Sequence, residues 1–283
     1  MSGRLAKRRG WRRVVNGVNL ASLLVAVFVS APLYWLVSAS LKSPVEIGAT
    51  PPTAYPHPVT LTNFRQAFLH YGFGRYLLNS VVVSLASTVL VLALGILAGY
   101  ALGRFPMRGK LPVLMGLLMI SVFPAIAVIS PLYLIMREIG WLNSYQALIL
   151  PYTAFNLPFA IWILRNYFIG IPPEMEEVGR LDGASPLRTL WSIILPQARP
   201  GIFTAAVFTF TACWTEFLMA VSFNSANGYR TIAVGIALFG SAFVVPYGTI
   251  FAASVAAVLP IAILVLVFRR SVVSGLTAGA VKG

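Results

Sequence analysis

The chain has 283 residues, of which 58% are hydrophobic and only 10% are charged, and its formal net charge is +14 at pH 7. Soluble domains are about a quarter charged, so this composition indicates a membrane protein. The positive charge lies in short clusters between apolar runs, which is typical of cytoplasmic loops and unlike a nucleic-acid-binding face with interleaved aromatic residues. The single cysteine, Cys213, excludes an intramolecular disulfide and a cysteine-cluster metal site.

Several apolar segments are long enough to cross a membrane as helices, which takes roughly 20 residues each. We expect spans over about 15–40, 78–102, 111–136, 144–168, 200–223 and 247–269. The first span follows a basic head at residues 1–14, as in a signal peptide. Its apolar part exceeds the roughly 7–15 residues of a signal peptide, so we expect an uncleaved helix. The expected fold class is therefore all-α, a single polytopic domain over 1–283 with six transmembrane helices.

The distribution of Lys and Arg predicts how these helices are oriented. With the N-terminus inside, the inner segments hold 16 of the 21 Lys and Arg residues. Such an excess marks the cytoplasmic side, so both termini, including the tail at 270–283, are expected in the cytoplasm. The long segment 42–76, rich in Pro and Thr, is then external. It is either a plain connector or a surface that meets an external partner.

The third expected span contains two prolines, Pro124 and Pro131. A proline frees backbone carbonyls within a span, which is tolerated where neighbouring helices or a cavity satisfy them. Pro124 therefore marks either a packing kink or a kink beside a polar path through the bundle.

Residues 170–197, between the fourth and fifth spans, hold most of the negative charge and are called the acidic loop below. Four of the chain's seven acidic residues fall within nine positions here: Glu174, Glu176, Glu177 and Asp182. Pro172 and Pro173 should end the fourth helix and start a short one, whose first turn holds the three glutamates at the positive end of the helix dipole. Glu176 can pair with Arg180 four residues later. This first helix is expected to display its acids to the cytoplasm.

A second short helix should follow directly. The pair Asp182-Gly183 suits the left-handed turn that closes a helix, and Ser185-Pro186 suits the start of the next. The spacing predicts a single apolar stripe that lies along the membrane surface or packs under the bundle. Its members are Leu187, Leu190, Trp191, Ile194 and Leu195.

Glu216 is the one acidic residue deep in an expected span, and such a residue is a functional candidate because charge in lipid is costly. Two roles stay open. Glu216 could line a polar path together with Trp214 and Phe217 as stacking or gating surfaces. It could instead make a structural hydrogen bond to a partner subunit near the outer surface.

The acidic loop resembles the EAA loop of ABC importer permeases, in which Glu-Ala-Ala, three residues, Gly, nine residues and Ile-x-Leu-Pro recur. Glu177, Gly183, Ile193 and Leu195-Pro196 fall in this register. Further stretches, "NSVVVS", "AGYALGRF", "WTEFLMAV" and "GLTAGAVKG", resemble the shorter six-helix subunit of carbohydrate permeases of the maltose/trehalose type. The chain departs from the family pattern at Val178-Gly179, which replaces Ala-Ala, and at Thr215, which replaces an Asn.

The resemblance implies a type I ABC importer permease fold and a subunit that moves a sugar, such as maltose or trehalose, across the cytoplasmic (inner) membrane. It also implies a second permease, two copies of a cytoplasmic ATPase that bind ATP and Mg, and an extracytoplasmic sugar-binding protein, with no cofactor in this chain. The implied ATPase-coupling residues are Glu176, Glu177, Arg180, Asp182, Gly183 and Ala184. Lys282 and Gly283 of the tail are implied as a further contact with the ATPase, and the candidate substrate path comprises Trp214, Glu216, Phe217 and Pro124.

Two other classes of protein fit the sequence less well. An ion-coupled secondary transporter needs internal repeats and several intramembrane ionisable residues. A membrane-embedded enzyme needs a catalytic constellation near one membrane face, and no such pattern is visible. The run nearest to an ATP-binding P-loop, "GRFPMRGKL", has one residue too many and carries Leu111 where Ser or Thr is required. We therefore expect no enzymatic activity in this chain.

Overall fold

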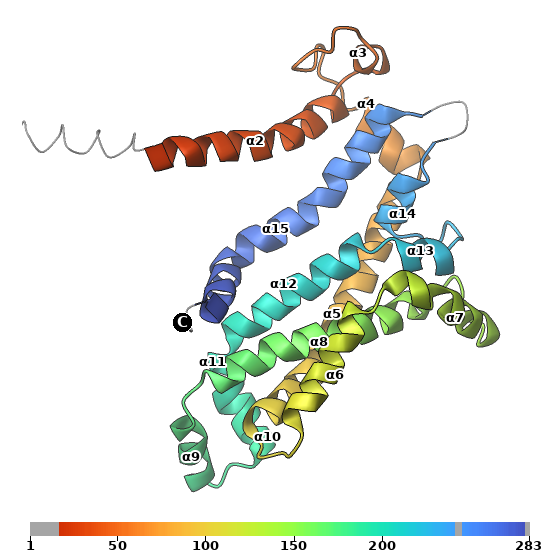
Figure 1. Cartoon of the computed structure of the whole chain (residues 1–283). Coiled ribbons are helices and arrows are strands. Elements are labelled where there is room, and N and C mark those ends of the chain that lie inside the picture. Colours follow the sequence, from red (N-terminus) through yellow and green to blue (C-terminus); the bar gives the residue numbers. More distant parts are fainter. Residues whose placement is uncertain (1–16, 241–244, 281–283) are drawn as a thin grey trace, which may run out of the picture. The chain divides into compact units, whose positions relative to one another are not determined.

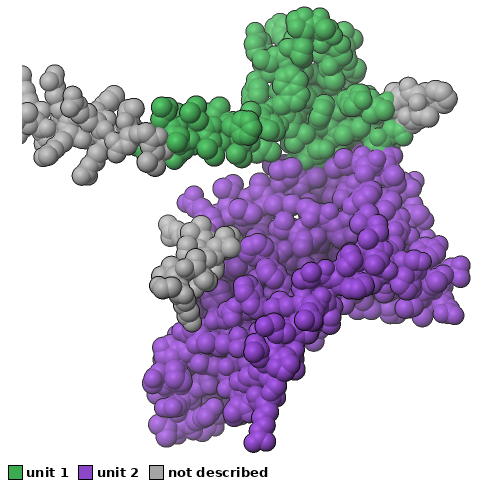
Figure 2. Space-filling model, in the orientation of Figure 1, with its two compact units in different colours: residues 1–71, 239–256 green, residues 72–238, 257–283 purple. Residues whose placement is uncertain are grey.

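The structure, a computed structural model, describes residues 17–240 and 245–280, and within them every regular element is helical. It divides into two compact units (Figure 2). Unit 1 comprises residues 1–71 and 239–256, and unit 2 comprises residues 72–238 and 257–283.

Unit 1 contains the first expected span and residues 42–71 of the segment expected to be external. Its helices are α2 (Gly17–Ser40), α3 (Pro44–Ile47), α4 (Thr62–Arg65), the π-helical η1 (Gln66–His70) and the start of α15 (Tyr247–Ala280). The described side chains of α2 stay exposed over most of its length, as expected of a surface that faces lipid or another subunit.

The external segment is folded rather than extended throughout. Lys42 is buried, donates to the carbonyl of Thr53 and lies 4.5 Å from the ring centre of Trp35. Glu46 accepts hydrogen bonds from the Thr53 hydroxyl at 2.8 Å and from the His57 N–H at 3.0 Å. Desolvation raises the pKa of the Glu46 carboxyl, but these hydrogen bonds and the Lys42 charge outweigh it and lower the pKa. These contacts give the segment a defined folded surface.

Unit 2 is a helical bundle whose long members run beside one another (Figure 1). Besides the rest of α15, its helices are α5 (Phe73–Arg104), α6 (Lys110–Val122), α7 (Ala125–Glu138), α8 (Gln146–Ile169), α9 (Glu174–Leu181), α10 (Pro186–Thr189), η2 (Leu190–Ile194), α11 (Leu195–Gln197), α12 (Arg199–Thr215), α13 (Leu218–Phe223) and α14 (Ile232–Ala237). Helix α5 packs along α8 and α12 at the centre. Helices α9 and α10 lie at one end of the unit, and α13 and α14 lie at the other.

Three glycines spaced four residues apart let α5 approach α8 closely. A Cβ built on Gly99 would lie 3.2 Å from the backbone nitrogen of Arg165, and the Cβ positions of Gly95 and Gly103 also face α8. Small residues at this spacing favour close helix packing in membranes, where lipid supplies no hydrophobic drive for association. The short distance between α5 and α8 therefore depends on the absence of side chains at these three glycines.

The described residues contain four helices long and apolar enough to cross a membrane: Asn19–Ser40, Phe73–Arg104, Gln146–Ile169 and Tyr247–Arg269. They correspond to the first, second, fourth and sixth expected spans. Two strongly bent helix pairs raise the number to six if each pair is one span. The expected all-α class is confirmed.

The third and fifth expected spans are interrupted rather than continuous helices: the kink expected at Pro124 is present, whereas the break at Glu216 was not expected. Helices α6 and α7 meet at an 86° bend at Phe123-Pro124, because a residue before proline is disfavoured in the helical region and Phe123 is extended, with ψ 132°. Pro131 lies inside α7 without ending it. The fifth segment is interrupted at Glu216, also extended with ψ 132°, between α12 and α13.

Candidate functional site

The acidic loop forms the helix–turn–helix that its sequence predicts. Its three glutamates occupy the first turn of α9. Gly183 has a φ of +74°, the left-handed region in which a side chain is strained, and its N–H donates to the carbonyl of Arg180 at 3.0 Å. The Ser185 hydroxyl accepts from the Arg188 N–H at 3.3 Å and caps α10, which begins with Pro186. The turn chemistry read from the sequence is confirmed.

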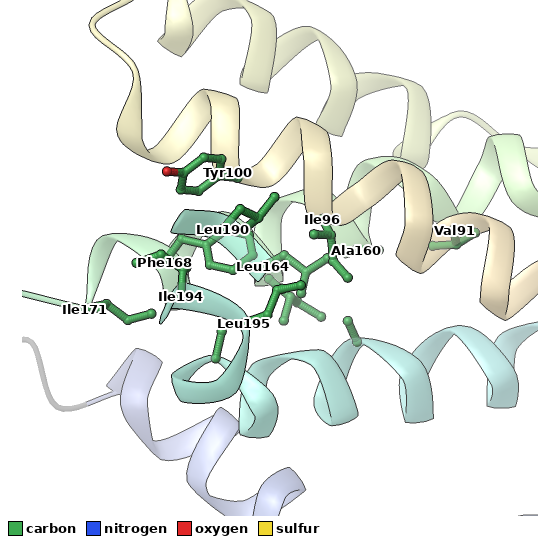
Figure 3. Packing of buried hydrophobic residues seen from close by; sticks show 13 residues of the cluster. Val91, Ile96, Tyr100, Ala160, Leu164, Phe168, Ile171, Leu190, Ile194 and Leu195 are labelled. Atoms are coloured by element: carbon green, nitrogen blue, oxygen red, sulfur yellow. The ribbon is translucent and has the colours of Figure 1, made fainter. Parts of the chain in front are cut away.

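The second half of the loop packs against the bundle, which is one of its two expected placements, but its five apolar residues do not form one stripe, and that part of the prediction is wrong. Leu190, Ile194 and Leu195 are buried in a cluster with side chains of α5 and α8, whereas Leu187 and Trp191 are 56% and 60% exposed. The π-helical turn of η2 changes the residue spacing, so the helical periodicity assumed for the stripe does not hold. Figure 3 shows the buried members beside Tyr100 and Phe168. The acidic loop is thus anchored in the core of unit 2.

Glu176 is not displayed to solvent, contrary to the expectation for the acids of α9. It is 6% exposed, and its Oε1 lies 2.7 Å from Nε of Arg104 at the end of α5. Arg180, which is exposed, lies on its other side at 3.8 Å. The expected pair with Arg180 therefore forms, but a second partner, the largely shielded Arg104, holds Glu176 on the inner side of α9.

The solvent-facing side of α9 combines negative charge with apolar surface. Glu177, Val178, Leu181 and Asp182 are all exposed, Leu181 to 87%, and these four residues are called the α9 face below. Exposed apolar side chains next to charge are typical of a surface that another protein covers. Ala184, directly after the turn, is half-buried.

The unusual Gly179 has a packing role. It is buried where α9 faces η2, and a Cβ built on it would lie 2.6 Å from Cδ1 of Ile193. The space that an alanine methyl group would occupy at this position is taken here by the end of the Ile193 side chain.

We expect Gly179→Ala to change stability little, by less than about 1 kcal/mol. Alanine gains about 1 kcal/mol of helix propensity, and the flexible end of Ile193 can move aside at a comparable cost. Thermal unfolding of the purified protein in detergent measures this. Gly179→Leu is the matched variant: it overfills the same space and should lower the unfolding temperature clearly, and equal stability of both variants would contradict the packing role.

The Glu216 carboxylate accepts three hydrogen bonds from groups of this chain. Its Oε1 accepts from the Met219 N–H at 2.9 Å, and its Oε2 accepts from the Ala220 N–H at 3.2 Å. The Tyr152 hydroxyl on α8 donates to Oε2 at 2.5 Å. The carboxylate therefore caps α13 and ties it to α8. These bonds give the Glu216 carboxylate a structural role within this chain.

The other residues of the candidate substrate path are mostly used in packing. Trp214 is 3% exposed, stacks on Phe210 at 5.4 Å and donates its indole N–H to the carbonyl of Ala257 at 3.1 Å. Phe217 packs against the buried cluster around Tyr152. Pro124 is exposed at the bend before α7. The structure thus offers no open aromatic surface at Trp214.

Two functional candidates were missed by the sequence analysis, and one pair of candidates lies outside the described residues. Arg104 follows an apolar run, but any arginine on the cytoplasmic side of a span has that position, so it does not mark a site. Nothing near Tyr152 in the sequence indicates its hydrogen bond to Glu216. Lys282 and Gly283 lie outside the described residues. Over the described part of the chain, the structure brings no three His, Cys, Asp or Glu residues together as a metal site.

Comparison with known proteins supplies the context for this geometry. Residues 92–276 match the family described as "Binding-protein-dependent transport system inner membrane component". The sulfoquinovosyl glycerol transport system permease protein SmoH of Agrobacterium fabrum is 39% identical over 93% of both chains. The trehalose/maltose permease MalG of Thermococcus litoralis is 36% identical over 93% of this chain and 95% of its own.

A third relative, the trehalose transport system permease protein SugB of Mycobacterium tuberculosis, is 38% identical over 97% of this chain and its own full length. Among solved structures, a bacterial ABC transporter involved in the import of the acidic polysaccharide alginate has a chain with a TM-score of 0.75. The similarity covers 90% of this chain and 95% of that chain at 21% identity, so it shows a shared fold.

Proposed function

Because this chain belongs to the family of binding-protein-dependent transport system inner membrane components, we propose that it forms part of the path of a carbohydrate through an ATP-driven importer. The chain is a permease subunit and not an enzyme, and a separate ATPase hydrolyses ATP. Importers of this family work with an ATPase and a substrate-binding protein. An ion-coupled secondary transporter finds no support among the relatives.

The proposed cargo is a di- or oligosaccharide, or a glycoside of similar size. One observation carries this proposal: three relatives that are 36–39% identical over nearly their whole length are permeases for sulfoquinovosyl glycerol, trehalose/maltose and trehalose. Uptake of labelled trehalose and maltose by cells with and without this chain tests it. Unchanged uptake of both, together with chain-dependent uptake of a solute that is not a sugar, would contradict it.

We further propose that the α9 face docks the ATPase, with both termini in the cytoplasm. An exposed short helix that offers Leu181 and Val178 between two carboxylates fits an apolar groove with a basic rim, which is a helix-in-groove contact. In this proposal Glu177 and Asp182 meet the rim, and Gly183 and Ala184 shape the turn. A second permease and two ATPase copies would complete the assembly, and the ATPase copies would hold the ATP and Mg.

Replacing Gly183 by valine tests the docking proposal. A β-branched side chain at a φ of +74° is strained by about 1–2 kcal/mol, so the turn should open and the α9 face should lose its orientation. We expect recovery of the ATPase with a tagged chain, measured by mass spectrometry after solubilisation in mild detergent, to fall about tenfold, the equivalent of about 1.4 kcal/mol.

Gly183→Asn is the matched control, because asparagine tolerates the left-handed region. It should retain the ATPase, since space around this position is open. Equal ATPase recovery from wild type and Gly183→Val would contradict docking through this turn. Recovery of the chain without any ATPase from wild-type membranes would contradict the docking proposal as a whole.

A further inference from the structure

The described residues contain two ion pairs, and Glu176 takes part in both. One partner, Arg180, belongs to α9 itself and is exposed. The other, Arg104, ends α5, and this pair is largely shielded from solvent: the two side chains are 9% and 8% exposed. A short ion pair out of solvent is weakly screened and holds its geometry, unlike most surface pairs.

Arg104 is placed to hold more than the carboxylate. While its Nε donates to Glu176 at 2.7 Å, its Nη2 donates to the carbonyl of Pro172 at 3.4 Å, just before α9 begins. The planar guanidinium thus binds both the residue pair that precedes α9 and the first turn of that helix. The single ammonium of a lysine could not make both hydrogen bonds in this geometry. Its position in the last turn of α5 also places a cation at the negative end of that helix.

The two halves of the acidic loop are joined to the bundle by different means. The η2 half is buried among apolar side chains of α5 and α8. The α9 half packs closely against η2 at Gly179, and its Glu176 forms an ion pair with Arg104 of α5. Helix α5 in turn contacts α8 through its glycine face, so Arg104 ends the helix that packs at the centre of unit 2.

We propose that Arg104 is a positioning residue of transport: its ion pair with Glu176 passes the movement of α9 to the spanning helix α5. This rests on the proposed docking of the ATPase on α9. The α9 face binds the ATPase, and the opposite side of α9, through Glu176, is fastened to the membrane domain. Loss of the Arg104–Glu176 pair should therefore leave the ATPase bound to α9 but prevent the movement of α9 from being transmitted to α5.

The test uses the complete transporter, purified from native membranes and reconstituted with its binding protein in proteoliposomes. Arg104→Gln and Glu176→Gln should each copurify the ATPase at the wild-type level. Sugar uptake driven by ATP should fall on the order of tenfold in each, which is the range of effects seen for residues that couple distant sites. The double variant Arg104→Glu with Glu176→Arg, which reverses the ion pair, should transport sugar faster than either single glutamine variant.

Arg108→Gln is the matched control, because it removes one exposed arginine four residues away in the same inner segment. It should transport like wild type. If the single glutamine variants fail to accumulate, Arg104→Lys keeps the charge without the second hydrogen bond, and it should bind the ATPase but transport more slowly.

Two results would overturn the inference. One is wild-type uptake by Arg104→Gln or Arg104→Lys. The other is loss of the ATPase from Arg104→Gln in parallel with uptake, since that would make the pair part of the dock. Failure of Gly183→Val to release the ATPase would instead count against the docking proposal, so the two can fail separately.

Discussion

Replacing Glu216 by alanine is expected to destabilise this permease by about 2–4 kcal/mol. The substitution removes the cap of α13, which typically contributes about 1 kcal/mol. It also leaves the Tyr152 hydroxyl without its acceptor in a buried site, at a cost of about 1–3 kcal/mol. The measurement is the thermal unfolding midpoint of the purified chain in detergent, followed by tryptophan fluorescence.

Tyr152→Phe is the control that separates the two contributions. It removes one of the hydrogen bonds to the carboxylate but keeps both bonds to the N–H groups of α13, so it should destabilise by only about 1 kcal/mol. In the double variant the two effects should not add, because the residues share one interaction. A wild-type midpoint for Glu216→Ala with lost sugar uptake would contradict the structural role and favour a place in the substrate path.

Replacing Gly99 by leucine is expected to have the largest effect on folding, at least about 3 kcal/mol, with loss of most of the protein from the membrane. The nearest neighbours of a Cβ at this position include the backbone nitrogen of Arg165 and the backbone oxygen of Ile161. Backbone atoms of a packed helix cannot move aside as a side-chain end can, so the two helices must separate. Quantitative immunoblotting of membranes, followed by thermal unfolding of what remains, measures the effect.

Gly116 provides a matched control, since it lies in an apolar helix but nothing lies within 4 Å of a Cβ built on it. Gly116→Leu should accumulate like wild type. Gly99→Ala, with a single added methyl group, should fall between the two. If leucine at both glycines were equally tolerated, close backbone contact between α5 and α8 would not be what holds the centre of unit 2 together.

Local patterns in the sequence were sufficient where the physical cause is local. Long apolar runs identify four of the spanning helices, because a helix satisfies its own backbone in lipid. The positions of Ser185, Pro186 and Gly183 identify the turn of the acidic loop, because capping and left-handed backbone depend on the residues themselves. The register of that loop also identified the family, which the match over residues 92–276 confirms.

Other features depend on what a residue meets across the fold. The π-helical turn of η2, which buries Leu190 and Ile194 but leaves Trp191 outside, follows from packing against α5 and α8. Glu176 and Glu177 are adjacent and chemically identical, yet one faces Arg104 and the other faces solvent. The sequence alone determined that this protein spans a membrane and carries an acidic helix–turn–helix, and the resemblance of that loop to ABC importer permeases indicated its class. Only the tertiary structure decided which carboxylates are exposed and which are held by hydrogen bonds and ion pairs within the fold. The reason is that partners distant in sequence, such as Arg104 and Tyr152, cannot be identified from local sequence patterns.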